Sequence, residues 1–146
     1  MAFGSRDRVA GAIGNRGCVW EAGTGKLLRS AELPGTVVQL VWLAADRIGM
    51  ISREAHWIEW RLESEKVVSG RLFDSLWVRV LGSSVDGQRF ALGLGKTVHV
   101  FEWGAPPQKI ASWDEPENVF CLGLCRDWVI VGTQSGAVAH RVPSKR

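Results

Sequence analysis

The chain has 146 residues, of which 46% are apolar and 23% are charged, the proportions of an ordinary globular protein rather than a disordered or collagen-like chain. Its formal net charge is +3, with Lys and Arg scattered through the sequence, whereas nucleic-acid-binding domains gather basic residues on a face or stripe. Eight Trp, seventeen Gly and no Tyr favour short turns and large buried rings. We therefore expect one domain over residues 1–146 that binds no nucleic acid.

No targeting or membrane segment is expected. The first eight residues lack the apolar stretch of a signal peptide, and no apolar run reaches the roughly 18 residues of a membrane helix. Three cysteines, Cys18, Cys121 and Cys125, form no even disulfide framework and fit a reducing compartment. These features predict a cytoplasmic protein that contacts no membrane, with the nucleus as the alternative compartment.

Four similar segments recur along the chain, and each carries a ring side chain near its end. Their alignment places four residues in one position: Trp20, Trp60, Phe101 and His140. The spacings between them are 40, 41 and 39 residues, and a period of about 40 residues is that of a four-stranded propeller blade. The sequence therefore predicts repeat units at about 9–35, 36–74, 75–117 and 118–142.

Each unit has the same internal order of short strands. Nearly continuous apolar segments at 36–42, 76–81 and 119–124 are typical of inner strands that are covered on both faces. Second strands follow at 9–14, 48–52, 90–95 and 129–133, and third strands run to the aligned rings. More polar outer strands come last, at 26–33, 65–73 and 108–113. No segment shows convincing 3.6-residue periodicity, so we predict an all-β chain.

The turns between these strands resemble those of a known family. Residues 19–27, Val-Trp-Glu-Ala-Gly-Thr-Gly-Lys-Leu, are similar to the junction between the third and outer strands in the WD-repeat β-propeller family. Residues 85–93, Val-Asp-Gly-Gln-Arg-Phe-Ala-Leu-Gly, resemble its loop between the first two strands of a blade. The glycines in both segments supply the positive φ angles that tight turns need. The resemblance extends over about residues 9–142.

The chain departs from this family at its hydrogen-bonded positions. No unit has the family's Gly-His pair, and the residues that follow the aligned rings are Glu21, Arg61, Glu102 and Arg141 rather than Asp. The family's tetrad of His, Asp, Ser or Thr and Trp is therefore not carried over to any blade. We expect packing of large rings to hold the blades together instead. These rings are Trp20, Trp42, Trp57, Trp60, Trp77 and Phe101.

The predicted strands make about three and a half four-stranded antiparallel blades, because the first blade lacks its inner strand and the last lacks its outer strand. A propeller ordinarily needs at least four blades to close, and an open arc leaves apolar faces and strand edges in water. Three completions follow: a longer chain or a partner protein supplies the missing part, the chain closes as a small four-bladed ring, or it assembles with another copy. We rank the first of these above the others.

Patterns that could indicate a cofactor or metal have a simpler interpretation. Residues 93–97, Gly-Leu-Gly-Lys-Thr, end like a phosphate-binding loop, but Phe90 stands where that loop needs its first Gly, and a strand rather than a helix follows. Cys121 and Cys125 lie about 13 Å apart in a strand, which is too far to share a zinc ion, and we interpret them as small buried apolar residues. We expect no cofactor and no metal.

The titratable residues likewise form no expected catalytic group. The histidines His56, His99 and His140 fall at different depths of neighbouring third strands, and His140 takes the packing position of a ring. One acidic group, Glu59, Glu63 and Glu65, is placed on a solvated strand and turn. The other, at residues 114–117, is interpreted as an exposed loop that at most offers an acidic edge to a basic partner.

The family resemblance implies a non-enzymatic scaffold that binds other proteins, or a second copy of itself, through loops on a rigid frame. Candidate partner-binding residues, chosen for expected exposure, are Arg47, Arg53, Trp113, Asp114 and Arg126. The alternative is a small closed or quinoprotein-like propeller with ligand-binding or enzymatic activity. That function needs polar inner strands, whereas the inner strands here offer only Gln39 and Arg79.

Overall fold

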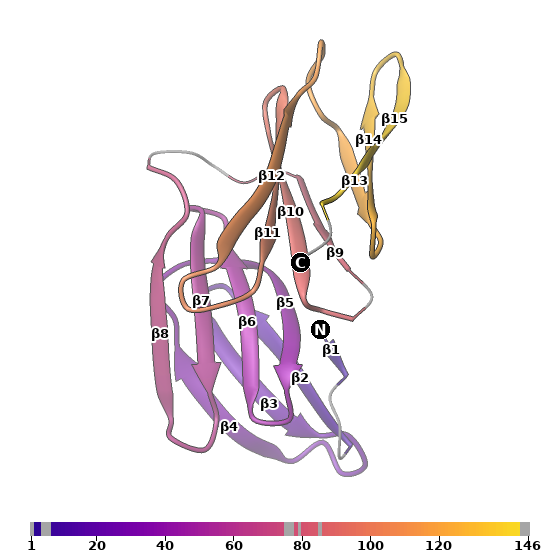
Figure 1. Cartoon of the computed structure of the whole chain (residues 1–146). Helices are drawn as coiled ribbons and strands as arrows, with labels where there is room; N and C mark the ends of the chain where they lie inside the picture. Colours follow the sequence, from indigo (N-terminus) through magenta and orange to yellow (C-terminus); the bar gives the residue numbers. More distant parts are fainter. Residues whose placement is uncertain (1, 4–6, 75–77, 79, 85, 144–146) are drawn as a thin grey trace. The chain divides into compact units, whose positions relative to one another are not determined.

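The computed structural model describes residues 2–3, 7–74, 78, 80–84 and 86–143 (Figure 1). Within these residues the chain forms fifteen strands and no helix, and the strands are arranged in four separate sheets. The chain divides into two compact units, Met1–Ser75 and Leu76–Arg146. Each unit contains two of the sheets.

The first unit holds two four-stranded sheets, named blade 1 and blade 2. Blade 1 consists of β1 (Ala2–Phe3), β2 (Arg8–Ile13), β3 (Arg16–Glu21) and β4 (Leu27–Glu32). Blade 2 consists of β5 (Val37–Ala44), β6 (Arg47–Ser52), β7 (His56–Arg61) and β8 (Lys66–Arg71). Every strand pairs antiparallel with the next one in the chain, which is the strand order of a propeller blade.

The second unit repeats this arrangement with one strand fewer. Blade 3 consists of β9 (Val80–Ser83), β10 (Arg89–Leu94), β11 (Thr97–Glu102) and β12 (Gln108–Asp114). Blade 4 consists of β13 (Cys121–Leu124), β14 (Trp128–Thr133) and β15 (Gly136–Arg141). In the described part of the chain, no strand pairs with the outer edge of β15.

The structure confirms the all-β prediction and corrects it at one end. Blade 1 was expected to lack an inner strand, but β1 pairs with β2 through Ala2↔Ala10 and Phe3↔Val9. The two residues of β1 are too few to show an apolar run, so the sequence pattern did not reveal it. The missing outer strand of blade 4 was predicted correctly for the residues described. Trp77 and Arg79 lie outside the described residues.

One backbone hydrogen bond recurs in all four blades and marks the repeat. The N–H of the residue after the third strand donates to a carbonyl in the turn before the second strand. The four bonds are Ala22 to Asp7 (2.7 Å), Leu62 to Asp46 (2.8 Å), Trp103 to Gln88 (2.9 Å) and Val142 to Asp127 (2.8 Å). The donors are spaced by 40, 41 and 39 residues, so the sequence period is a period of blade geometry.

Each unit buries an apolar core between its two blades. In the first unit, Ala10 and Val19 of blade 1 face Ile48 and Trp60 of blade 2. In the second unit, residues of blade 3 including Ala91, Val98 and Val100 pack with residues of blade 4 including Val129 and Val131. Each blade uses one face in this contact. We call the contacting face of blades 1 and 3, and the equivalent face of blades 2 and 4, the forward face, and the opposite one the rear face.

The rings that were expected to hold the blades together differ in how deeply they are buried. Trp60 is 2% exposed within the core of the first unit, and Trp42 packs against that core. Trp57 and Phe101 are also buried. Trp20 occupies the same aligned position as Trp60 but is only partly buried, because it lies on the rear face of blade 1.

Candidate functional site

The predicted partner-binding residues of the first unit do not share a surface. Arg47 is the first residue of β6 and Arg53 follows its last residue, so the two lie at opposite ends of one strand. The Arg47 guanidinium lies 3.2 Å from the carboxylate of Glu59. Glu59 was expected to be solvated, but its side chain is 3% exposed, and Arg61 provides a second partner at 2.9 Å. A buried carboxylate needs such partners, so Arg47 has a structural role in blade 2.

The predicted residues of the second unit are also separated. The carbonyl of Arg126 accepts a bond of 2.8 Å from Arg89, at the start of β10, whereas Asp114 accepts one of 2.9 Å from Thr97, which pairs with the last residue of β10. Trp113 stacks on the ring of His140, with centroids 4.8 Å apart and planes inclined by 14°. The structure therefore shows His140 in the packing role that its aligned position predicted.

The acidic loop at residues 114–117 is only partly the exposed edge that the sequence suggested, since Asp114 and Pro116 are exposed but Glu115 is not. Glu115 is buried, and its Oε1 lies 2.5 Å from Nε2 of His140. The hydroxyl of Ser135 donates to the carboxylate of Glu117. Each carboxylate of the loop, including that of Asp114, thus meets a donor on a neighbouring hairpin. The loop connects blade 3 to blade 4 and uses its charges to fix that connection.

Two arginines that the sequence analysis did not single out link neighbouring blades. Arg8 donates to the carbonyl of Ala45 in the first turn of blade 2, and its guanidinium lies 5.1 Å from the Trp42 ring centroid, within the range of a cation–π contact. Arg89 makes the equivalent bond to Arg126. Both arginines begin a second strand, so the repeat alignment contained this signal.

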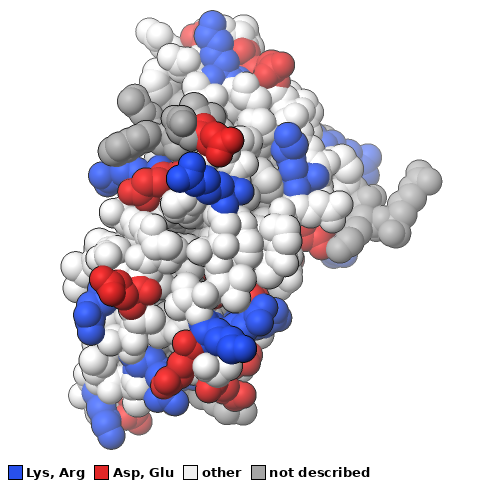
Figure 2. All heavy atoms as spheres, turned by 90° about the vertical axis from the view of Figure 1, so that its left-hand side faces the viewer, with Lys and Arg blue, Asp and Glu red and all other residues white. Residues whose placement is uncertain are grey.

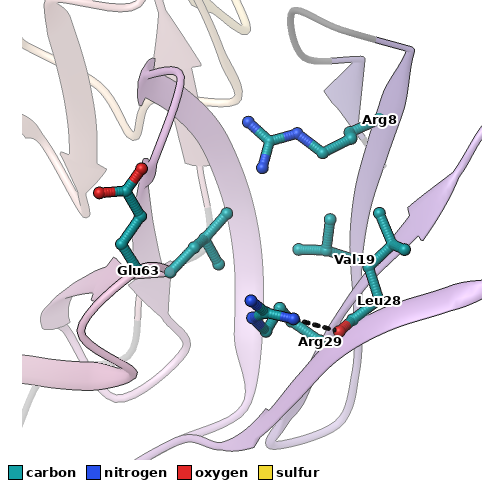
Figure 3. A pocket seen from close by; sticks show the side chains of 6 residues that line it. Arg8, Val19, Leu28, Arg29 and Glu63 are labelled. Atoms are coloured by element: carbon teal, nitrogen blue, oxygen red, sulfur yellow. Dashed lines mark hydrogen bonds between the residues drawn. The ribbon is translucent and has the colours of Figure 1, made fainter.

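A hollow of about 260 Å³ opens between blades 1 and 2 and is shown in Figure 3. Its lining includes two cationic side chains, Arg8 and Arg29, together with Glu63. Arg8 is committed to Ala45, and Arg29 donates to the carbonyl of Leu28 at 2.9 Å. Only the Arg8 guanidinium thus links the two blades, because the Arg29 bond goes to its own neighbour in the chain. The lining holds no nucleophile beside a base, which a hydrolytic site requires.

A second hollow of about 240 Å³ lies beside the loop that connects blades 3 and 4. Its lining combines Lys96, Pro116 and Glu117 with the exposed ring of Phe120. The carboxylate of Glu117 is occupied by Ser135. This hollow likewise lacks the paired groups of a catalytic centre.

Most of the exposed large apolar side chains of the described residues belong to blade 1 and blade 4, with Val38 on blade 2 and Phe120 before β13 as the others. On blade 4, Trp128 is 44% exposed and Ile130 is 42% exposed, and both lie on the forward face of β14. On blade 1, Ile13 is 77% exposed and Leu27 is 52% exposed, and both lie on the rear face with Trp20. Arg16 pairs with Ile13 and Arg141 pairs with Trp128, so each of these faces combines exposed apolar side chains with a positive charge.

Two cysteines were predicted incorrectly. Cys121 and Cys125 were expected to be buried, but both are exposed, and all three cysteines of the chain are free thiols. Cys121 pairs with Gly132 on the forward face of blade 4. The prediction failed because it took β13 to be covered on both sides, whereas only the rear face of blade 4 contacts another blade in its unit.

The charge distribution shows no single-sign patch on the face in Figure 2. Lys and Arg side chains lie there among Asp and Glu side chains. Separately, none of the described residues belongs to a helix with the length and apolar character needed to cross a membrane.

Solved structures of WD40 propellers share this fold. The C-terminal WD40 domain of Sif2 superposes with a TM-score of 0.73 at 17% identity, over 89% of this chain and 41% of that chain. The β-propeller domain of Myceliophthora thermophila Cps50 (Swd1) gives 0.73 at 12% identity, over 97% and 52%. A chain of the mitotic checkpoint complex gives 0.68 at 11% identity, over 94% and 46%.

A computationally designed protein, Ika4, is also similar, with a TM-score of 0.71 at 19% identity over 95% of this chain and 88% of that chain. No family model and no curated protein matches the sequence. The structural matches show the fold: the chain forms part of a WD-repeat-like β-propeller. It spans about half the length of the WD40 chains that it matches.

Proposed function

We propose that this protein is a non-enzymatic scaffold for protein–protein interaction, a WD-repeat-like propeller segment that a partner or a longer chain completes. The observation that carries the proposal is the uncovered forward face of blade 4, where Trp128 and Ile130 remain exposed. The similarity to WD40 propellers, one of them in a multiprotein checkpoint assembly, supports the same class of function.

The chemistry of this face suits a protein partner. Cross-strand neighbours lie on the same face of a sheet, so the pairs Ile130↔Ala139 and Gly132↔Ala137 place small apolar residues around the exposed Ile130 side chain. Trp is enriched in the buried centres of protein interfaces. The face therefore offers the Trp128 ring and the Ile130 side chain to a partner surface, with Arg141 beside the ring and Cys121 over Gly132.

The outer edge of blade 4 offers a second mode of contact. In blades 1, 2 and 3 the third strand pairs with an outer strand, but among the described residues β15 pairs only with β14. An exposed edge presents unpaired N–H and C=O groups to another extended segment. A partner that supplies one strand would give blade 4 the four strands of the other blades.

We further propose that the protein works in the cytoplasm or the nucleus. The three cysteines are free, which fits a reducing compartment. The five partner-binding candidates from the sequence remain part of the proposal. Arg53 and Arg126 are exposed residues that lie between strands.

The test is site-specific photo-crosslinking in cells that express the protein. A photoreactive residue at position 130 should yield a discrete adduct with another polypeptide chain. The matched control is position 138, where Val138 has nearly the same exposure, 44% against 42%, but lies on the rear face. Equal or absent adducts at the two positions would contradict the proposal, and a stoichiometric chromophore or metal in the purified protein would favour the enzymatic alternative.

A further inference from the structure

The two covered contacts within the chain show how one blade packs on the next. Forward faces carry small side chains in their centre: Ala10 pairs with Val19 in blade 1, and Ala91 pairs with Val100 in blade 3. Rear faces carry the aligned rings, such as Trp60 in blade 2, which packs into the core of the first unit. The general pattern is a bulky rear face against a forward face of small residues.

The rear face of blade 1 and the forward face of blade 4 belong to these same two types. The rear face of blade 1 carries Trp20 beside Val9 and Leu27, in the positions that Trp60, Ile48 and Val67 take in blade 2. The Trp20 ring lies across Gly11, where an added Cβ would be 3.1 Å from its Cζ3 atom. This ring is therefore already held in a fixed place on the face, without a blade to cover it.

The forward face of blade 4 is the counterpart of the forward faces of blades 1 and 3. Ile130 pairs with Ala139 and Gly132 pairs with Ala137, in the positions of Ala10 with Val19 and Ala12 with Gly17 in blade 1. In the covered contact, Gly17 is the residue against which Trp60 packs, because an added Cβ would be 3.1 Å from the Trp60 ring. The equivalent residue on blade 4, Ala137, is also small.

We propose that a second copy of this chain covers both faces, with the rear face of blade 1 in each copy packed against the forward face of blade 4 in the other. The inference rests on the proposed function and names the partner. In this contact Trp20 takes the role of Trp60. Ile130, Ala137 and Ala139, together with Cys121, whose Sγ lies over Gly132, take the role of the forward face of blade 1.

The presence of both types of uncovered face on one chain favours a second copy over a different partner. The rear face of blade 1 carries an aligned ring, and the forward face of blade 4 carries small side chains. Two copies hold eight blades, which is within the range of known propellers. A two-fold arrangement also satisfies both faces at once, whereas one contact alone would leave a face open and extend into a filament.

One substitution in the repeat adapts blade 4 to this role. The second strands of blades 1 and 3 begin with Arg8 and Arg89, which bond to the turn of the following blade. In blade 4 the same position is Trp128. The forward face of blade 4 therefore carries an exposed ring where blades 1 and 3 carry a charged link, and Arg141, which pairs with Trp128, places a positive charge beside that ring.

The first measurement is the mass of the purified 146-residue chain by light scattering. We expect about twice the chain mass of 16.1 kDa, with dissociation on dilution. A mass of one chain at all concentrations overturns the inference. If the chain is monomeric but position 130 still forms an adduct with another protein, the dimer is wrong and the proposed function stands. The failure of the dimer can therefore be told apart from the failure of the proposed function.

Complementary variants then test which faces meet. The first variant, Ile13→Asp with Leu27→Asp, damages the rear face of blade 1, and the second, Ile130→Asp, damages the forward face of blade 4. All three residues are exposed, so circular dichroism should show folded proteins. Ala139→Lys, at an exposed position on the same forward face, replaces the second variant if Ile130→Asp does not fold.

Each variant alone should be monomeric, because both contacts of the pair are then damaged. An equimolar mixture should form dimers, because the intact blade 4 of the first variant meets the intact blade 1 of the second. Val138→Asp, on the rear face of blade 4, is the matched control and should leave the dimer intact. Dimers of either single variant, or a mixture that stays monomeric, would overturn the inference.

Discussion

The two covered contacts of this protein use the same positions with different chemistry. Between blades 1 and 2, Trp60 packs beside Gly17 and Leu33. Between blades 3 and 4, the positions equivalent to Trp60 and Leu33 are taken by His140 and Glu115, which bond to each other, while Trp113 supplies the large ring. The equivalence of Leu33 and Glu115 follows from their backbone bonds to Asn15 and Lys96.

This difference shows which properties a contact between two blades requires of its side chains. The first contact depends on volume, since a large ring fits only where its neighbour has no side chain. The second depends on a buried polar pair, whose partners must both be present. A blade contact therefore tolerates either solution, provided that size and polarity change together on both sides.

The largest expected effect comes from removing the central ring of the first contact. Trp60→Ala should lower the free energy of unfolding by about 3–5 kcal/mol, because it leaves a cavity in a closely packed core. Chemical denaturation measures this loss. The control is Val38→Ala, at a residue that is 39% exposed, which should cost under about 0.5 kcal/mol. Equal effects of the two substitutions would contradict the packing described here.

The same contact can be overfilled. Gly17→Ala should lower the free energy of unfolding by about 1–3 kcal/mol, because the new methyl group would press on Trp60 and Leu33. Gly23→Ala is the matched control, since no atom lies within 4 Å of a Cβ added there. A Gly17→Ala protein as stable as the Gly23→Ala protein would show that the ring is not packed closely against β3.

The second contact should respond to paired changes. Glu115→Leu copies the first contact at one position and leaves the partly buried imidazole of His140 without its acceptor, at a cost of about 1 kcal/mol in the free energy of unfolding. Adding His140→Phe removes that unpaired group and should restore part of the loss. A double-mutant cycle measures this coupling, and strictly additive effects would argue against a pair.

The smallest expected effect is a pH dependence in blade 3. Burial, reinforced by the charge of Lys109, lowers the pKa of His99 below its ordinary value of 6.5. The unfolded chain therefore binds a proton at a higher pH than the folded chain, so the stability that His99 contributes is present above pH 6.5 and declines as the pH falls below it. His99→Gln should flatten this decline in denaturation curves. An unchanged slope would assign the dependence to another group.

A related acidic effect is expected in the turn before β10. The hydroxyl of Ser84 donates to Asp86 at 2.6 Å, and this bond lowers the pKa of the Asp86 carboxyl below 3.8. Its contribution to stability is present above pH 3.8 and is lost as the pH falls through the lowered value. Asp86→Asn should make acid unfolding slightly less steep. Ser84→Ala should change it in the same direction, because it removes the same hydrogen bond.

The sequence predicted the elements that depend on periodic apolar residues and rings. The spacing of Trp20, Trp60 and Phe101 located the blades, because the third strand of every blade carries its ring at the same height. The sequence did not predict which rings are covered. Trp20 and Trp60 occupy equivalent positions, and their different burial follows from whether another blade precedes them.

The polar contacts could not be predicted from the sequence pattern, because they also depend on which blade lies next to which. Glu115 looked like one charge in an exposed loop, and it is buried only because β15 brings His140 to it from 25 residues away. Cys121 was expected to be buried but is exposed, because its apolar strand β13 belongs to blade 4, which has one uncovered face. Neighbouring blades, rather than local sequence, determine burial in a repeat fold.

The incomplete blade 4 is tested most directly by amide hydrogen exchange on the purified protein. Third strands β3, β7 and β11 pair on both edges, whereas β15 pairs only with β14 among the described residues. Alternate amides of β15 should therefore exchange much faster than their counterparts in the other three strands, even in a dimer joined through blade faces. Equal protection of all four strands in the isolated chain would contradict a blade that awaits completion.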